Sequence, residues 1–559
     1  MNARPWLPKS VECLRRYDRR SFGADLIAGI TVGLVALPLA LAFAISSGVP
    51  PQAGLYCAVI AGFLISALGG SRTQIGGPTG AFVVVVSGIV AHHGLDGLLT
   101  CTIMAGVILI VLGATGMGTA VDFIPRPVIV GFTNGIAVLI ASTQIKDLLG
   151  LDIPEVSGVF LPRLIQIANA FPTISLPATV LAATSLVIII AGNKLIRRVP
   201  GTILALFAGT IAAVLLALPV ETIGSHFGGV PAGLPPFAPP RFRPELLHPL
   251  LAPALTVAML GAIESLMSAV VADRMTGDRH NPNVELIAQG VANIAAPMFG
   301  GLPATGAIAR TATSIRSGAK TPVAGMVHAL TLLAILVFAA PYARFVPLAI
   351  LSAILLVVAY HMGDWEEIPE LLKLSRADIS VWLVTFALTV FADLTVAVEA
   401  GMILAALLFI RKVAATTTVS EVTDEDIEEG RVHVLQDKVI PDYATVFRIH
   451  GPFLFGSTDK LDAVADRIAE LPAIVILRLR NMTAIDATGV RALEDLADRL
   501  HATGRALILC GARAQPAKLM DRAEFDEHIG KANVCANVQE ALARAREIRG
   551  AKATEIPPA

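Results

Sequence analysis

The chain has 559 residues, of which 55% are hydrophobic and 16% are charged, with a formal net charge of −1 and a mean hydropathy of +0.70. A soluble protein of this composition would expose large apolar patches, which soluble monomers avoid, so the composition excludes an ordinary soluble protein. The near-neutral charge argues against a nucleic-acid partner. We therefore expect a polytopic protein in contact with the lipid bilayer.

Residues 1–22 form an N-terminal segment rich in basic side chains, namely Arg4, Lys9, Arg15, Arg16, Arg19 and Arg20. Cytoplasmic segments carry an excess of such residues, so this segment is expected to stay in the cytoplasm. The apolar run that follows it is too long for the apolar region of a cleavable signal peptide. We interpret this run as a retained first span.

From residue 23 to residue 413 the chain is a transmembrane domain of successive apolar runs, each of about 17 to 25 residues, the length that crosses a bilayer as a helix. We expect roughly fourteen such segments. With that number, the basic clusters at residues 194–198, 274–279 and 411–412 all fall on the cytoplasmic side. The predicted location is the cell (inner) membrane, with both termini cytoplasmic.

Two short motifs recur in the same order at nearly the same separation. GGPTGAF at residues 76–82 resembles LPATGAI at residues 302–308, about 225 residues later, and FIP at residues 123–125 recurs as FVP at residues 345–347. Transporters are often built from such repeats. The recurrence predicts two halves of about seven segments each, and because seven is odd, the halves would be inverted across the membrane.

The first of these motifs breaks a helix at membrane depth in each half. Irregular backbone is tolerated there only where protein buries it or a cavity hydrates it, and a helix that restarts after the break directs its N–H groups and positive dipole end into that cavity. Two such half-helices would form an anion site, with the hydroxyls of Thr79 and Thr305 as further donors. The alternative is that the small residues merely permit close helix packing.

Two charged residues are expected inside the membrane, where an unpaired charge is costly and usually functional. Glu264 follows some ten apolar or small residues and is a candidate site of proton or cation coupling, with the Ser268 hydroxyl one turn further along the same face. Arg310, about one turn into the second half-helix, is a candidate for holding an anion. The alternatives are a Glu264–Arg310 ion pair, a hydrogen bond from Glu264 to a backbone break, and an Arg310 side chain that extends to the cytoplasmic edge.

The composition changes after about residue 413. We predict an acidic linker at residues 414–438, a soluble α/β domain at 439–549 and a tail at 550–559. ATVFRIHGPFLFG, AIVILRLRNM and ALILCG are typical of strands, and TGVRALEDLADRLHATG has apolar residues at helical spacing with a glycine just after its end. This alternation predicts a small mixed sheet covered by helices. The five cysteines have no paired spacing, so they indicate neither a disulfide framework nor a metal site.

Several of these stretches resemble the SulP family of anion transporters, the sulfate permeases. They are DLIAGITVGLVALPLALAFAISSGVPPQAGLY, GGPTGAF, IESLMSAVVADRMTGDRHNPNVELIAQGVANI and GGLPATGAIARTAT, while NMTAIDATGV near the C-terminus resembles a STAS domain. The resemblance extends from about residue 21 to residue 549. Among bacterial members the chain looks most similar to proton-coupled C4-dicarboxylate transporters, although the family also carries sulfate and bicarbonate.

The resemblance implies a polytopic α-helical fold of fourteen membrane segments in two inverted sets of seven, divided into a core and a gate domain. It implies homodimers in which the core moves against the gate like an elevator. Glu264 matches an acidic residue linked to cation coupling, and Arg310 matches a basic position near the anion in animal relatives. The substrate would lie between the third and tenth segments, which begin here at Thr79, Gly80 and Ala81 and at Thr305, Gly306 and Ala307.

The STAS-like segment contains one candidate regulatory residue. In related anti-sigma-factor antagonists a phosphorylated serine occupies the position that Thr488 takes in DATG. Thr488 is therefore a candidate phosphorylation site, and a cytoplasmic protein is a candidate partner of this domain. The alternative is that the loop only caps the helix that begins there.

These features predict secondary active transport of an anion of the sulfate, C4-dicarboxylate or bicarbonate class, as symport with H⁺. We expect no enzymatic activity, no cofactor and no bound metal, and the chain has no ATPase motif. The alternatives are an uncoupled exchanger, an anion channel, a membrane sensor that signals through the STAS domain, and a bicarbonate symporter coupled to Na⁺. A channel is disfavoured because it needs no titrating carboxylate, whereas Glu264, Ser268 and backbone carbonyls could ligate Na⁺.

Overall fold

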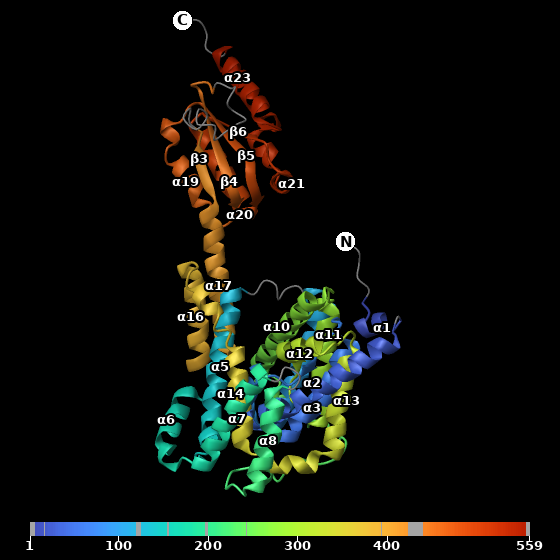
Figure 1. Cartoon of the computed structure of the whole chain (residues 1–559). Helices are drawn as coiled ribbons and strands as arrows, with labels where there is room; N and C mark the ends of the chain where they lie inside the picture. Colours follow the sequence, from blue (N-terminus) through green and yellow to red (C-terminus); the bar gives the residue numbers. More distant parts are fainter. Residues whose placement is uncertain are drawn as a thin grey trace. The chain divides into compact units, whose positions relative to one another are not determined.

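The protein is described from a computed structural model, which covers residues 6–15, 17–118, 125–153, 156–195, 200–241, 243–392, 394–422 and 440–554. The chain divides into two compact units, Met1–Ile403 and Leu404–Ala559 (Figure 1). The first unit is helical, and the second contains a five-stranded sheet.

Helices account for nearly all the regular structure of the first unit. In chain order they are α1 (Lys9–Leu14), α2 (Arg19–Ser46), α3 (Pro51–Leu68), α4 (Ala81–Ala114), α5 (Arg126–Leu149), α6 (Phe160–Ala170), α7 (Leu176–Leu195), α8 (Gly201–Leu215), α9 (Ile223–Phe227), α10 (Leu251–Thr276), α11 (Pro282–Ala295), α12 (Ile308–Arg316), α13 (Val323–Phe338), α14 (Leu348–Met362), α15 (Glu367–Leu371), α16 (Arg376–Phe391) and α17 (Leu394–Thr416), the last of which continues into the second unit.

Seven helices of the described residues are long and apolar enough to cross a membrane, and α8 and α13 are shorter apolar helices. Among the seven, α4 has 34 residues, which at 1.5 Å per residue is longer than one crossing requires. It bends at Gly94, which has a φ of 68°, a conformation that glycine adopts at little cost. α4 therefore supplies two membrane segments, one on each side of the bend.

The helices fall into two matching sets of seven segments, as predicted from the repeated motifs. The first set is α2, α3, the two parts of α4, α5, α7 and α8, and the second is α10, α11, α12, α13, α14, α16 and α17. The recurring prolines occupy equivalent places, since Pro125 immediately precedes α5 and Pro347 immediately precedes α14. The other two residues of the first FIP motif lie outside the described residues.

The segments of both sets mix into two bundles. In one bundle α4 packs against α10 and α11, and α13 packs against α2 and α3. In the other bundle α5 packs against α14 and α16, and α7 packs against α8 and α14. Figure 1 shows α5, α14 and α16 side by side, apart from α2, α3 and α13. We call the first bundle the core and the second the gate.

The second unit is a small α/β domain. Its strands are β3 (Thr418–Glu421), β4 (Ala444–Phe453), β5 (Ile474–Ile485), β6 (Ala506–Cys510) and β7 (Val534–Cys535), in that spatial order. β3 is antiparallel to β4 and the other neighbours are parallel. Its helices are α19 (Asp459–Ala465), α20 (Ala487–Ala502), α21 (Ala514–Arg522), α22 (Phe525–Ile529) and α23 (Val538–Thr554). The predicted mixed sheet, three of its strands and the helix α20 are confirmed.

Apolar residues on both faces explain why the central strands are nearly continuous hydrophobic runs. Successive side chains of a strand point to opposite faces, so Val475 and Leu477 of β5 pack with α19 to α22, whereas Ile474 and Ile476 pack with α23. Regular structure extends beyond the predicted boundaries of this domain at two places. β3 lies inside the predicted linker because its four residues pair with β4, and α23 continues into the predicted tail. Most of the predicted linker lies outside the described residues.

Candidate anion site

The two repeated motifs lie side by side in the middle of the first unit. β1 (Gly76–Gly77) and β2 (Thr305–Gly306) form a two-stranded antiparallel ladder in which Gly76 lies opposite Gly306 and Gly77 opposite Thr305. A helix starts directly after each motif: α4 begins at Ala81 and α12 begins at Ile308. Neither start has a side-chain cap among the described residues. The motifs therefore bring two uncapped helix N-termini together, an arrangement that suits an anion.

The first motif connects directly to the half-buried acidic residue Glu264. The Thr79 hydroxyl donates a 2.8 Å hydrogen bond to the Oε2 atom of Glu264 on α10. Gly80 faces apolar side chains, because a Cβ added there would lie 2.7 Å from the Met362 sulfur and 3.4 Å from the Ile140 Cδ1 atom. Met362 is the last residue of α14 and Ile140 lies on α5, so the start of α4 lies where the core meets the gate.

The second motif is held by a relay of hydrogen bonds to α10. The Gly306 N–H donates to the Ser265 hydroxyl at 3.0 Å, the Ser265 and Thr305 hydroxyls are 2.7 Å apart, and the Thr305 hydroxyl donates to the Gly261 carbonyl at 2.9 Å. The Ala307 N–H donates to the Ile75 carbonyl at 2.8 Å. The predicted binding groups of Thr305, Gly306 and Ala307 are thus bonded within the protein in this structure. The first N–H groups of α12 after them remain available to a ligand.

Arg310 lies behind the first motif. Its side chain is only 3% exposed, and its Nη2 atom donates to the Pro78 carbonyl. Its Nη1 atom is buried without a hydrogen-bond partner among the described residues and lies beside Gly77, where an added Cβ would be 2.8 Å away. Two alternatives from the sequence are therefore wrong: the side chain does not extend to an aqueous edge, and no ion pair within 4 Å joins it to Glu264.

Ser268 does not share an environment with Glu264. It is fully buried, and its hydroxyl lies 3.0 Å from that of Thr311 on α12, which in turn accepts a 3.0 Å hydrogen bond from the Ile75 N–H. The proposed pairing of Ser268 with Glu264 came from helical spacing alone. Helix packing directs Ser268 toward α12, while Glu264 meets the first motif.

Three residues that hold the site, Ser265, Asn293 and Gln74, are not among the predicted binding residues. Besides Ser265, the Asn293 amide bonds to both the N–H and the carbonyl of Ala304, each at 2.8 Å, and the Gln74 amide donates to the Ser265 carbonyl at 3.1 Å. The only sequence signal for them is that polar amides and hydroxyls in apolar helices join helices together. Their partners are backbone groups distant in sequence, so no local pattern identifies them.

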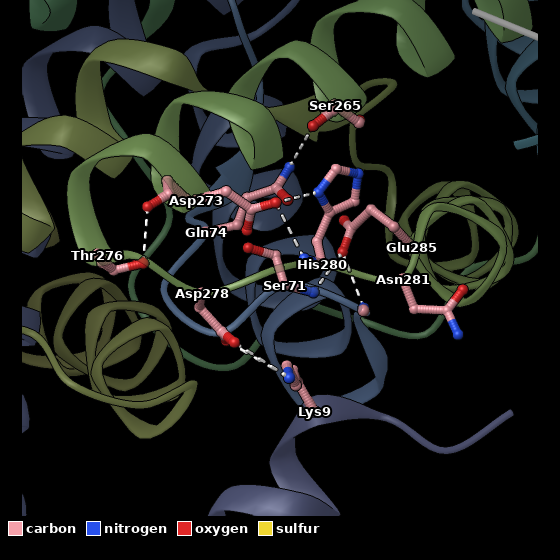
Figure 2. A network of polar contacts seen from close by, with 12 residues as sticks. Lys9, Ser71, Gln74, Ser265, Asp273, Thr276, Asp278, His280, Asn281 and Glu285 are labelled. Atoms are coloured by element: carbon pink, nitrogen blue, oxygen red, sulfur yellow. Dashed lines mark hydrogen bonds and ion pairs between the residues drawn. The ribbon is translucent and has the colours of Figure 1, made fainter. Parts of the chain in front are cut away.

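A polar network involves the loop before the first motif, the end of α10 and the start of α11 (Figure 2). Glu285, fully buried on α11, accepts hydrogen bonds from the N–H groups of Gly70 at 2.9 Å and Ser71 at 3.2 Å, in the loop that leads to β1. His280 contacts Asp273 at 2.7 Å at the end of α10. The Glu285 contacts fix the loop before the first motif against α11, which also carries Asn293. The His280–Asp273 contact joins the segment before α11 to the end of α10, the helix that carries Glu264.

In the second unit, the structure places Thr488 in the first turn of α20 with its side chain exposed. Asp486 caps this helix by accepting a 2.8 Å hydrogen bond from the Gly489 N–H, and it also accepts from the Phe455 N–H at 3.0 Å. The capping role anticipated for this loop therefore belongs to Asp486.

Known proteins share both units. Residues 22–385 match the Sulfate permease family and residues 435–541 match the STAS domain. The chain is 42% identical over 517 residues to the putative sulfate transporter YvdB of Bacillus subtilis, which covers 92% of this chain and 96% of that protein. It is 29% identical over 550 residues to the bicarbonate transporter BicA of Picosynechococcus sp., with 94% and 95% covered. The solved structure of SLC26A9 has the same fold, with a TM-score of 0.86 and 18% identity over 99% of this chain and 94% of that one.

These relatives are named as sulfate or bicarbonate transporters, so the particular likeness to C4-dicarboxylate transporters is not supported by them. The family match covers most of the first unit, and the YvdB match covers nearly the whole chain. The chain therefore belongs to the sulfate permease (SulP) family of anion transporters and carries a C-terminal STAS domain.

Proposed function

We propose that this protein transports sulfate or bicarbonate across the cell membrane by symport with H⁺, and that the anion binds between the starts of α4 and α12. The observation that carries the coupling is the hydrogen bond between Thr79 and Glu264. It joins a carboxyl group on α10 to the motif that opens the first half-helix. A proton on Glu264 would therefore change the hydrogen bonding of the anion site itself.

Three sources of positive potential support anion binding at this place. The N-termini of α4 and α12 meet there without side-chain caps, and the buried guanidinium of Arg310 adds a full charge. Thr79, Gly80 and Ala81 line the first start, while Thr305, Gly306 and Ala307 shape the second. Sulfate and bicarbonate are favoured as substrates because relatives that match nearly the whole chain are named as transporters of these anions. A C4-dicarboxylate is a third candidate substrate.

The proposed transport cycle moves the core against the gate in an elevator-like manner. The start of α4 lies against Ile140 and Met362, so movement at this boundary would cover and uncover the anion site. We further propose a homodimer with both termini in the cytoplasm, and a regulatory STAS domain in which phosphorylation of Thr488 would recruit a cytoplasmic protein. The exposed hydroxyl in the first turn of α20 supports this last point.

Uptake into liposomes tests the proposal. The purified protein would be reconstituted, and the uptake of labelled sulfate, bicarbonate and succinate would be measured with and without an inward proton gradient, and with and without an inward Na⁺ gradient. We expect one anion to accumulate faster with the proton gradient. In Glu264→Gln, which keeps the size of the side chain, this acceleration should be lost.

The matched control is Glu245→Gln, which removes an exposed carboxylate outside the site and should leave the proton response unchanged. Uptake that is accelerated by the Na⁺ gradient and not by the proton gradient would show that the coupling ion is Na⁺, bound near Glu264, and not H⁺. Anion flux that ignores both gradients and survives Glu264→Gln would overturn symport and leave an exchanger or a channel.

A further inference from the structure

A buried arginine lies on the gate side of the anion site. Arg163, on α6, is 2% exposed and is among the largest fully buried side chains of the protein. Its α6 neighbours Leu161, Leu164 and Ile165 are exposed, so the helix turns its apolar residues outward and its arginine inward. In a membrane protein the exposed apolar side chains suit a lipid environment, and a charged side chain that faces the protein interior is usually functional.

The hydrogen-bond acceptors that the structure describes around Arg163 are all neutral. Its Nε atom donates to the Ser157 carbonyl at 2.9 Å and its Nη2 atom donates to the Gly158 carbonyl at 2.8 Å. Its Nη1 atom donates to the Ser142 hydroxyl at 2.9 Å and to the Leu139 carbonyl at 3.2 Å. Among the residues that the structure describes, no carboxylate lies within 4 Å of this guanidinium. Within the described part of the chain, the donors are satisfied but no side chain neutralises the charge.

The guanidinium and the anion site lie on two sides of one helix. Leu139 and Ser142 belong to α5, and Ile140 between them borders Gly80 at the start of α4. A helix with its side chains is about 10–12 Å across, so the charge lies about that far from the first half-helix. Across a low-dielectric protein interior a full charge at this distance still acts appreciably on another charge.

We propose that Arg163 is a positioning residue that attracts the anion electrostatically from the gate side, opposite Arg310 on the core side. This inference rests on the proposed anion site. Arg163 has no counter-ion among the described residues, and burying a charge in this way is costly, so a transported anion would supply negative charge there. Because the attraction scales with the charge of the anion, Arg163 would favour a divalent anion over a monovalent one.

The charge dependence provides the test. The apparent affinities of sulfate and bicarbonate, each measured as a substrate or as a competitor of the transported anion, would be compared in wild type, Arg163→Gln and Arg163→Lys. With an effective dielectric constant of about 20, removal of the charge should lower the affinity for bicarbonate about tenfold and the affinity for sulfate about a hundredfold. Arg163→Lys keeps the charge, so its apparent affinities for both anions should lie within about threefold of the wild-type values.

A second pair of variants applies even where Arg163→Gln does not fold. Ser142→Asp places a carboxylate against the guanidinium while Arg163 still anchors α6. It should therefore lower the affinity for sulfate more than the affinity for bicarbonate, as Arg163→Gln does. The asparagine of Ser142→Asn is nearly as large as aspartate but has no charge, so this variant should leave the ratio of the two affinities unchanged. Arg344→Gln, which removes an exposed arginine, should also leave the ratio unchanged.

Equal weakening of the two anions in both Arg163→Gln and Ser142→Asp would overturn the inference and make Arg163 only an anchor for α6. Failure of Arg163→Lys to restore affinity beyond Arg163→Gln would do the same. Wild-type protein that neither transports nor binds any anion would instead overturn the proposed function, so the two failures are distinguishable.

Discussion

The two half-helix motifs have similar sequences but different surroundings. Around the second motif, Thr305, Gly306 and Ala304 are all bonded to α10 or α11 through Ser265, the Gly261 carbonyl and Asn293. At the first motif, Thr79 bonds to one side chain, that of Glu264, and Gly80 faces apolar residues of the gate. The repeat thus supplies two similar turns, and the helices around them decide what each turn does.

The difference suggests a division of labour. The second motif is fastened to the core by buried hydrogen bonds, which makes it a rigid support for the start of α12. The first motif carries the contact with the titratable group and the boundary with the gate. Variants of corresponding residues should therefore affect stability in the second motif and transport in the first.

The largest effect is expected for the paired glycine variants. In Gly306→Ala the added Cβ would overlap the Gln74 amide and lie 3.1 Å from the Ser265 Cα atom, and overpacking of this kind should cost about 3 kcal/mol or more. In Gly80→Ala the nearest atom is the Met362 sulfur at the end of a flexible side chain. We expect Gly306→Ala to lose folded protein in size-exclusion chromatography and thermal unfolding, and Gly80→Ala to fold but transport slowly. A Gly306→Ala variant with wild-type Tm would contradict the rigid support.

Arg310 links the two motifs, because it starts from α12 and bonds to Pro78 beside β1. In Arg310→Gln the loss of a buried charge should raise the KM for the anion by about tenfold or more, since charges inside membrane proteins usually serve the transported ion. Arg310→Lys should raise the KM less, because lysine keeps the positive charge although it lacks the planar guanidinium of arginine. Liposome uptake across anion concentrations measures both, and a KM unchanged in Arg310→Gln would remove Arg310 from the anion site.

The paired threonines should separate stability from transport. Thr305→Val leaves the Gly261 carbonyl and the Ser265 hydroxyl short of a partner in a buried place, which should destabilise the protein by about 1–3 kcal/mol. Thr79→Val removes one hydrogen bond to the half-buried Glu264 and should shift Tm less, while the dependence of uptake on the proton gradient changes. Equal shifts of Tm with unchanged coupling in both variants would contradict the division of labour.

The smallest effect is expected away from both motifs, in the STAS domain. Thr488→Ala leaves the Asp486 cap of α20 in place and should change anion uptake by unmodified protein less than about twofold. Asp486→Ala removes that cap and should lower the stability of the domain by about 1 kcal/mol. Thermal unfolding and uptake of the two variants provide the measurement, and a large loss of uptake in Thr488→Ala would show that the hydroxyl acts without modification.

Local features of the candidate site could be predicted from the sequence. The starts of α4 and α12, the bend of the backbone before them and the position of Glu264 within a long apolar helix follow from glycine, proline and apolar runs that act within a few residues. The cap of α20 by Asp486 is equally local. The partners of these groups were not predictable. Ser268 meets Thr311, and Arg310 meets Pro78 and not Glu264, because side-chain direction depends on how each helix is rotated against its neighbours.

The sequence by itself determined the membrane class, the two halves, the positions of the helix breaks and the alternating strands and helices of the STAS domain. These features depend on hydropathy, periodicity and backbone freedom, which are properties of short stretches. Only the tertiary structure decided that the second motif is fastened by Ser265 and Asn293, that Thr79 contacts Glu264 and that Arg163 is buried beside α5. Each of these contacts joins residues far apart in the chain, and close packing of the helices selects them.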